Sequence, residues 1–306
     1  MNRSTHRTVL VAGLANIAIA VIKLAAGIAA GSAAMLAEAA HSLADTLNQG
    51  FLLTSLHRSD RPADRAHPFG YGKERYFWSL LAAVGIFVAG AGFSVFEGVL
   101  AIGHGGEAGS PTVAYLVLAV AFVAEGTALT RAVYQVRHEA AGQGRSMREQ
   151  MRRSADTTVR TALFEDTSAL IGLLVAAAGL ALRQLTGSAV WDGAASIVIG
   201  LLLVAVAYSL GRTSMHMLIG QAAQPEEQRA ITREIEATPG IEKVLDLLTM
   251  QLGPEDLIVG AKVAFTDDIS ADHAEDLADD VDRRLRELLP VVRHVFLDPT
   301  QLSASS

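Results

Sequence analysis

The sequence predicts an α-helical membrane protein with six transmembrane helices in residues 1–220 and a smaller C-terminal α+β domain, of order αββαβ, in residues 221–306. The first observation is composition: 51% of the 306 residues are hydrophobic, 19% are charged and the mean hydropathy is +0.33. The second is a set of six long apolar stretches. The third is a change after Gly220, where apolar runs give way to short alternating segments rich in acidic residues.

Each of the six stretches is long enough to cross a bilayer, whose hydrocarbon core of about 30 Å needs roughly 20 apolar residues per helix. They cover residues 8–30, 32–56, 76–102, 113–136, 161–182 and 190–210. The first is too long for a removable signal peptide and lacks a small-residue cleavage signal, so we expect it to be retained.

The basic residues between these stretches predict the orientation of the chain. Arginines and lysines concentrate before the first stretch, between the second and third, and between the fourth and fifth, whereas the other three connections contain only Arg183. Because basic loops stay in the cytoplasm, both termini are expected to be cytoplasmic. The short basic amino terminus has no transit-type extension, so we expect an integral protein of the cell (inner) membrane.

The last third of the chain has the pattern of a two-layer α+β domain. Helices are expected at residues 225–237 and 272–289, and strands at 241–252, 256–265 and 291–297. From Ala222 onward there are 18 acidic and 8 basic residues, which argues against a nucleic-acid partner.

Charged side chains within the predicted helices are the candidate functional residues, because burying a charge in a membrane is costly. They are Lys23, Glu38, His41, Asp45, Glu97, Glu125, Glu165 and Asp166. His41 and Asp45 have i, i+4 spacing, which places an imidazole and a carboxylate on one helix face. The chain has no cysteine, so any metal site must use His, Asp and Glu.

Glu165 and Asp166 lie in a second apolar helix and could complete a four-coordinate site with His41 and Asp45. This nitrogen and oxygen donor set suits Zn²⁺, with Fe²⁺, Co²⁺, Ni²⁺ or Mn²⁺ as alternatives. Neighbours in a helix point about 100° apart, so Asp166 is our first choice and Glu165 an adjunct. Because metal binding requires neutral His and ionised carboxylates, filling the site would release protons, which is the basis of metal/proton antiport. A histidine changes charge near physiological pH, so His41 is the natural group to carry the exchange.

Structural roles compete with these functional ones. His41 and Asp45 could simply form a hydrogen bond between packed helices, and Lys23 could neutralise one of the buried acids. Glu38 is equally compatible with either role, and Glu97 and Glu125 are interpreted mainly as structural or interfacial. Asn48 is expected to bond between helices rather than to bind metal.

Two long motifs resemble the cation diffusion facilitator family of divalent-metal/proton antiporters. They are the run from Ser32 to Gln49, SAAMLAEAAHSLADTLNQ, and the run from His67 to Trp78, HPFGYGKERYFW. The resemblance implies six spans, a ferredoxin-like cytoplasmic domain through which homodimers form, and export of Zn²⁺ by alternating access. It also implies that the protein is a secondary transporter and not an enzyme, with Zn²⁺ as substrate, H⁺ as coupling ion and no resident cofactor.

The resemblance assigns His41 and Asp45 to the ligand positions of the second span and Asp166 to the aspartate of the fifth. Members of this family commonly have a histidine four residues before that aspartate, where this chain has Ala162. The run around Glu165 is similar to a Glu-Asp branch of the family, in which Glu165 would replace the histidine.

Secondary metal sites are expected to be reduced. Asp64 and His67 fit a peripheral site in the loop after the second span, although His67 before Pro-Phe-Gly is equally well explained as part of a turn. In the tail, His273, His294 and Asp298 are too few for a robust binuclear site, so dimer packing is expected there without one. The alternatives to a zinc exporter are an exporter of Fe²⁺, Co²⁺, Ni²⁺ or Mn²⁺, and a metal-responsive membrane scaffold that does not transport.

Overall fold

The structure is a computed structural model that describes residues 3–105, 109–142, 157–266 and 270–300. Contacts divide the chain into two units. The first comprises Met1–Leu53 and Ser79–Arg212, and the second Thr54–Trp78 and Thr213–Ser306. The sequence-based boundary after residue 220 follows the order of the chain, whereas the contacts group the segment between the second and third apolar stretches with the C-terminal sheet.

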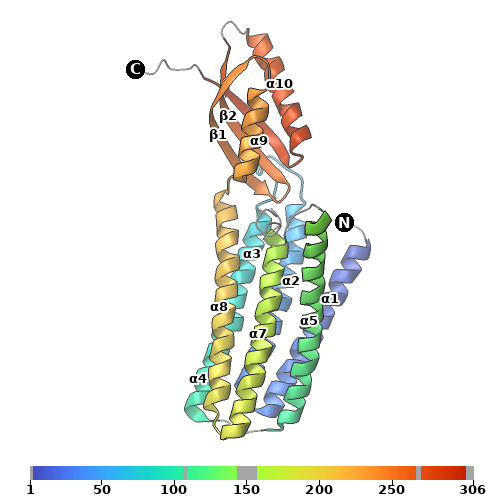
Figure 1. Cartoon of the computed structure of the whole chain (residues 1–306), viewed down its shortest axis with the longest axis vertical. Helices are drawn as coiled ribbons and strands as arrows, with labels where there is room; N and C mark the ends of the chain where they lie inside the picture. The colour runs from blue at the N-terminus through green and yellow to red at the C-terminus, as the bar shows by residue number, and fades with distance from the viewer. Residues whose placement is uncertain (1–2, 106–108, 143–156, 267–269, 301–306) are drawn as a thin grey trace. The chain divides into compact units, whose positions relative to one another are not determined.

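Long helices occupy all of the predicted apolar stretches (Figure 1). They are α1 (Arg3–Ala30), α2 (Ala33–Ser59), α3 (Glu74–Gly85) with η1 (Ile86–Gly92) and α4 (Phe93–His104), α5 (Pro111–Gly142), α7 (Thr157–Thr186) and α8 (Val190–Ile219).

The helical transmembrane domain is confirmed, with four clear spans among the described residues. These four are Glu74–His104, Pro111–His138, Leu163–Thr186 and Val190–Ile219, which are long and apolar enough to cross a membrane. In α1 the segment with described side chains, Asn16–Ala30, is also apolar. Helix α2 has the length of a span, but it carries the polar side chains on which the functional prediction depends.

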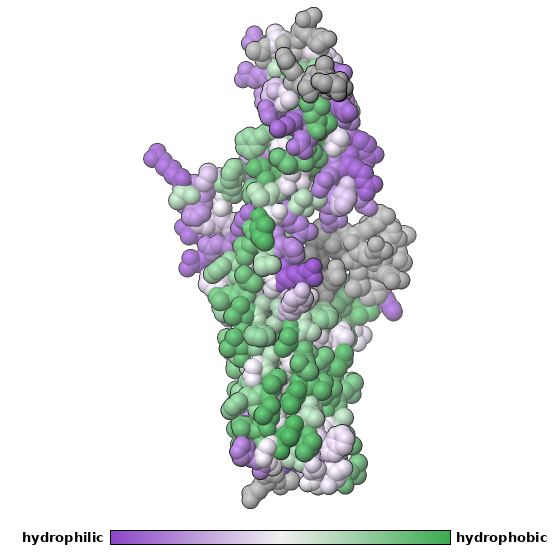
Figure 2. Space-filling view, turned by 90° about the vertical axis from the view of Figure 1, so that its left-hand side faces the viewer, coloured by the Kyte–Doolittle hydropathy of each residue, from purple (hydrophilic) through white to green (hydrophobic). Residues whose placement is uncertain are grey.

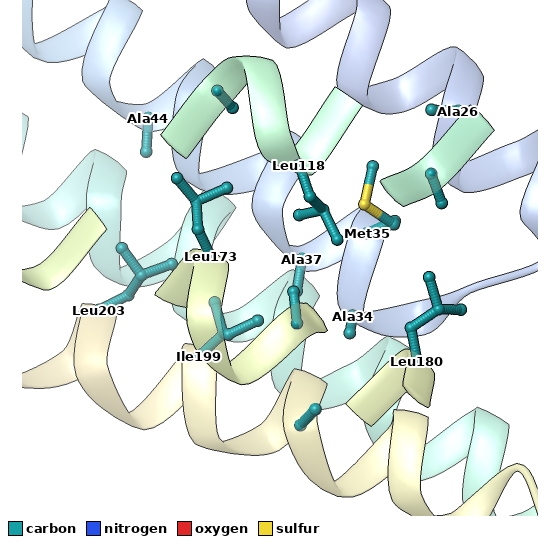
Figure 3. Packing of buried hydrophobic residues seen from close by; sticks show 14 of the residues in the cluster. Ala26, Ala34, Met35, Ala37, Ala44, Leu118, Leu173, Leu180, Ile199 and Leu203 are labelled. Atoms are coloured by element: carbon teal, nitrogen blue, oxygen red, sulfur yellow. The ribbon is translucent and has the colours of Figure 1, made fainter. Parts of the chain in front are cut away.

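Small side chains line the interior of the helical unit. Its core is formed largely by alanines, with Met35, Leu118, Leu173, Leu180, Ile199 and Leu203 between them (Figure 3). A β-carbon at Gly98 of α4 would lie 2.6 Å from the carbonyl oxygen of Gly193 of α8, and one at Gly193 would lie 2.6 Å from that of Gly98. Such contacts between small residues let helix backbones approach closely, which is how helices pack in lipid.

The span Glu74–His104 contains a wide turn near its middle. Residues Ile86–Gly92 form the π-helix η1, and the Ser94 hydroxyl donates a hydrogen bond of 2.8 Å to the carbonyl of Gly90. A β-carbon at Gly90 would lie 3.1 Å from Leu203 and 3.4 Å from Ala44. The glycine therefore allows the wide turn to pack directly against α2 and α8.

A buried polar network joins the start of α2 to the α7–α8 connection. Asp192 is fully buried and accepts hydrogen bonds from the Ser32 hydroxyl (2.7 Å), the Ala33 amide (2.7 Å) and the Arg183 guanidinium (3.2 Å). Arg183 also donates to the carbonyl of Gly31 at 2.5 Å. The sequence suggested only a loop arginine here, whereas the structure shows Arg183 buried, with its charge compensated by Asp192.

The outer surface of the helices is apolar. Exposed side chains include Ile28, Val88, Leu116, Val123 and Leu201, and the surface of the helical unit in Figure 2 is predominantly hydrophobic. A surface of this kind faces lipid rather than water.

The C-terminal domain has the predicted αββαβ order. Its elements are α9 (Pro225–Glu236), β1 (Ile241–Gly253), β2 (Asp256–Phe265), α10 (Ala271–Leu288) and β3 (Val292–Pro299). The central strand β2 pairs antiparallel with β1 and parallel with β3. Both helices cover one sheet face, where Leu257, Val259, Ala261 and Val263 of β2 join Ile231, Ile235, Val281 and Leu285 in a core (Figure 1).

The opposite sheet face is covered only in part by the described residues, since Phe69 packs on His294 and the Lys73 ammonium lies 3.8 Å from Met250 Sδ. One row across it pairs Leu248 with Gly260 and Phe296, and the next pairs Met250 with Ile258 and His294. Leu248 is 65% exposed and Phe296 is 55% exposed. Side chains alternate between the faces of a strand, so these residues point away from the helices and form an apolar surface that we call the open sheet face.

Candidate functional site

The polar residues predicted to share one face of α2 lie side by side there, and His41 is the more deeply buried of the two. His41 Nε2 lies 3.5 Å from Asp45 Oδ2, as expected for residues one helical turn apart. The His41 side chain is 5% exposed, whereas that of Asp45 is 31% exposed. Asp45 therefore forms the more accessible end of this pair.

Helix α7 faces this stripe with the other predicted residues. The Asn48 amide of α2 donates a hydrogen bond of 3.3 Å to Glu165 Oε1 of α7. Asp45 is also close enough to Glu165 and Asp166 for their charges to interact. A side-chain hydrogen bond therefore joins the polar residues of α2 and α7.

The four predicted ligands do not all converge on one point. Within the described ranges, no three His, Asp or Glu side chains lie close enough together to hold a metal ion. One oxygen of Glu165 is held by Asn48, so Asn48 has the interhelical role expected from the sequence. The ligand set of His41, Asp45, Asp166 and Glu165 stays a prediction.

Lys23 neutralises a buried acid, as one of the sequence interpretations held. Its ammonium lies 3.1 Å from Glu38 Oε2, and the two side chains are 2% and 0% exposed. The other oxygen, Glu38 Oε1, has no hydrogen-bond partner in the described part of the chain. A β-carbon at Gly172 of α7 would lie 2.5 Å from this oxygen and 3.9 Å from His41 Nδ1.

Glu125 of α5 belongs to the same electrostatic environment, which the sequence interpretation missed. Its charge interacts with those of Lys23, Asp45, His41 and Asp166. Because Glu125 is the only acidic residue in its predicted span, no spacing within that helix indicated which neighbours it faces. Only the packing of helices distant in sequence brings it to this group.

The predicted peripheral pair lies in a tightly bonded turn within the second unit. Asp64 Oδ1 accepts hydrogen bonds from the amides of Ala66 (2.9 Å) and His67 (2.8 Å), and Oδ2 accepts one from the Tyr71 hydroxyl (2.7 Å). His67 Nδ1 is 3.6 Å from Asp64 Oδ1, and the guanidinium of Arg61 lies 4.3 Å from the centre of the Tyr71 ring. This geometry matches the turn interpretation, and metal binding by Asp64 and His67 stays a prediction.

These hydrogen bonds shift the pKa values of two side chains in the loop. The hydrogen bond from Tyr71, followed by the amide of His67, lowers the pKa of the Asp64 carboxyl below its ordinary value. The same bond to Asp64 is the main reason that the pKa of the Tyr71 hydroxyl is raised. The carboxylate form of Asp64 therefore holds the turn together.

The three tail residues considered for a second metal site are dispersed among different elements. His273 lies in the first turn of α10, and His294 and Asp298 lie in β3. The His294 ring packs edge-on against Phe69 of the same unit, with ring centres 5.2 Å apart. The expectation that the tail lacks a robust binuclear site stays a prediction.

Comparisons with known proteins agree with this architecture. Residues 9–219 match the cation efflux transmembrane domain, and residues 223–298 match the cytoplasmic domain of cation efflux proteins. The chain is 36% identical over 243 residues to the proton-coupled zinc antiporter SLC30A9, mitochondrial, of Xenopus laevis, covering 79% of this chain and 44% of that protein. It is also 24% identical over 300 residues to the manganese efflux system protein MneS of Bacillus subtilis, covering 95% of this chain and 94% of the other.

Among solved structures, the C-terminal domain is similar to the copper form of the MamM CTD. The match has 14% identity and a TM-score of 0.24, covering 26% of this chain and 88% of the other. The chain spans less than half the length of the SLC30A9 relatives that it matches. Its two matched domains nevertheless cover almost all of its own length, so the chain belongs to the cation efflux (cation diffusion facilitator) family of membrane transporters, which are not enzymes.

Proposed function

We propose that this protein exports divalent metal cations, with Zn²⁺ as the principal substrate, from the cytoplasm in exchange for protons. The metal would bind between α2 and α7, with His41, Asp45 and Asp166 as ligands and Glu165 as the fourth. The observation that carries the proposal is the opposition of two acidic helix faces inside an apolar helical unit. Burying these charges is costly, and a dication held between them would compensate that cost.

The donor set gives the exchange its mechanism. Zn²⁺ takes four ligands from imidazole and carboxylate groups, all in their deprotonated forms. Protonation of the same groups therefore competes with the metal, and a proton gradient can drive its release on the acidic side. No covalent step and no resident cofactor is required, because the metal is the substrate and the proton is the coupling ion.

The relatives support this substrate class, since the printed name of SLC30A9 describes a proton-coupled zinc antiporter. The direction of transport rests on the arginine-rich connections, which favour cytoplasmic termini and insertion in the cell (inner) membrane. A tag at each terminus that resists protease in sealed cells and is cleaved after permeabilisation would support this orientation. Cleavage in sealed cells would contradict it.

We also propose that two copies pair through the cytoplasmic domain. The open sheet face, with Leu248 and Phe296 exposed on its two outer strands, is an apolar surface on a domain that otherwise carries many charged residues. Apolar surfaces of this kind typically form the core of homodimer interfaces.

Proteoliposomes with a pH gradient test the transport proposal. Zinc-dependent proton flux should be present in the wild type and lost in Asp45→Ala, because the substitution removes a ligand. Glu97→Ala is the matched control, since it removes a carboxylate from a different span and should leave the flux unchanged. Equal flux in Asp45→Ala and the wild type would overturn the proposed site.

A metal panel in the same vesicles tests the identity of the substrate. Zn²⁺ should drive the fastest proton flux, and a faster flux with Mn²⁺, Fe²⁺, Co²⁺ or Ni²⁺ would reassign the substrate within the same architecture. Absence of flux with every metal in correctly folded wild-type protein would favour the non-transporting scaffold.

A further inference from the structure

The Lys23–Glu38 pair lies next to the candidate metal site but does not belong to the predicted ligand set. It is the most deeply buried ion pair of the helical unit that involves α2. Isolated buried pairs of this kind are rarely worth their desolvation cost for stability alone. Its position beside His41 therefore points to a role in the site itself.

The surroundings of the two nitrogens of His41 differ. Nε2 lies 3.5 Å from Asp45, at the end of the pair that is accessible. On the Nδ1 side, Gly172 leaves a space in which both His41 Nδ1 and Glu38 Oε1 lie within 4 Å of the position of an added β-carbon. Glu38 Oε1 is also one of two buried side-chain oxygens without a hydrogen-bond partner among the described residues.

A histidine that binds a metal through Nε2 needs a hydrogen-bond acceptor beside Nδ1. Neutral imidazole carries one N–H, so a cation that binds through Nε2 requires the proton on Nδ1 and an acceptor next to it. Carboxylates that accept the second N–H of a metal-bound histidine fix its tautomer and ring orientation, and they raise the basicity of the ligand.

We propose that Glu38 is a positioning residue for His41. This structure contains no hydrogen bond between the two side chains. When the cation binds, Oε1 turns to accept the Nδ1 proton, so that Nε2 is presented to the cation beside Asp45. Lys23 holds the other oxygen and so fixes the orientation of the Glu38 carboxyl, and Gly172 leaves space beside it. This inference rests on the proposed function, because it assigns a role at the same metal site.

Two double variants separate this role from a structural one. Lys23→Met/Glu38→Leu removes both charges and the acceptor, whereas Lys23→Met/Glu38→Gln removes both charges and keeps an oxygen that can accept from His41. Neither leaves an unpaired buried charge, so both should fold, as checked by thermal unfolding. Purified full-length protein in detergent is then titrated with Zn²⁺ by calorimetry and with Co²⁺ by visible absorption.

The leucine double variant should bind Zn²⁺ about 10- to 100-fold more weakly than the wild type, in line with the loss of other such carboxylates. The glutamine double variant should recover most of this loss. In proteoliposomes, the leucine variant should raise KM for Zn²⁺ more than it lowers kcat, since the ligand is misoriented but not removed. Equal Zn²⁺ affinity in the two folded double variants and the wild type would overturn the proposal.

Gly172→Ala tests the same contact with both charges intact. Its β-carbon would lie 2.5 Å from Glu38 Oε1 and must displace the carboxylate from His41, so Zn²⁺ binding should weaken and the Co²⁺ spectrum should change. Gly126→Ala of α5 is the matched control, because nothing lies within 4 Å of its added β-carbon. Wild-type binding by Gly172→Ala would also contradict the proposal.

The controls distinguish failure of this inference from failure of the proposed function. If the wild type binds Zn²⁺ and His41→Ala does not, but the leucine double variant binds normally, only the role of Glu38 is wrong. If the folded wild type binds no metal, the proposed function itself is wrong.

Discussion

Removing Asp192 should destabilise the helical unit more than any exposed substitution. Its carboxylate is fully buried and accepts hydrogen bonds from Ser32, Ala33 and Arg183, and the Arg183 side chain is itself 6% exposed. Asp192→Ala therefore removes the carboxylate that pairs with the buried Arg183 guanidinium. Breaking a buried pair in this way costs about 3–5 kcal/mol. For a domain of about 150–250 residues, each kcal/mol lowers Tm by about 2–4 °C, so the expected decrease is about 6–20 °C.

The measurement is thermal unfolding of purified protein in detergent, followed by circular dichroism at a helical wavelength. Thr127→Ala, an exposed substitution in α5, is the control and should change Tm by no more than about 2 °C. The double variant Arg183→Met/Asp192→Leu should regain at least half of the loss, because no buried charge is left unpaired. A Tm for Asp192→Ala within the range of the control would refute the reasoning.

Three further outcomes follow from the described contacts. Gly98→Ala would place a β-carbon 2.6 Å from a backbone carbonyl and should cost about 1–3 kcal/mol of unfolding free energy, whereas Gly126→Ala should not lower it. Asp64 has a lowered pKa in the folded loop, so the stabilisation that its carboxylate gives is present above the ordinary aspartate pKa and is lost as pH falls through the lowered value. Asp64→Ala should therefore speed hydrogen exchange of the two amides that Asp64 binds at pH 7. In strong acid, the exchange rates of the variant and the wild type should converge. Phe296→Asp on the open sheet face should weaken dimerisation by about 30-fold or more in analytical ultracentrifugation, and the exposed Glu287→Ala should not; an unchanged dimer in Phe296→Asp would exclude this face as the interface.

The sequence predicted the elements of the C-terminal domain almost to the residue, because its turn signals are local. Pro225 begins α9, and Gly253 with Pro254 separates β1 from β2, as expected from their backbone preferences. The long helices of the first unit were predicted equally well, because the length of an apolar stretch can be read directly from the sequence. The count of six spans was harder to establish, because α2 carries the polar residues that weaken its membrane signal.

The site was predicted in part, and the limit was the packing between helices. The pairing of His41 with Asp45 followed from i, i+4 spacing, but the neighbours of Glu125 and the role of Asp192 depend on helices distant in the chain. Arg183 and Asp192 lie nine residues apart across the connection between two predicted spans, so no helical spacing linked them. The space at Gly172 beside Glu38 is likewise a property of α7 packed against α2.

The π-helical turn η1 divides the span Glu74–His104 into two α-helical halves, α3 and α4. Before the turn, Ala82 and Ala83 of α3 face the interior, and after it Gly98 of α4 makes the backbone contact with Gly193. A π turn contains about one residue more than an α turn, so η1 accommodates an additional residue within the span. Converting Ile86–Gly92 to an ordinary α-helix without removing a residue would rotate the part beyond it and turn Gly98 away from α8, whereas removing one residue at the same time would keep Gly98 directed at α8. The wide turn therefore keeps the contacts of α3 and α4 in place despite the additional residue.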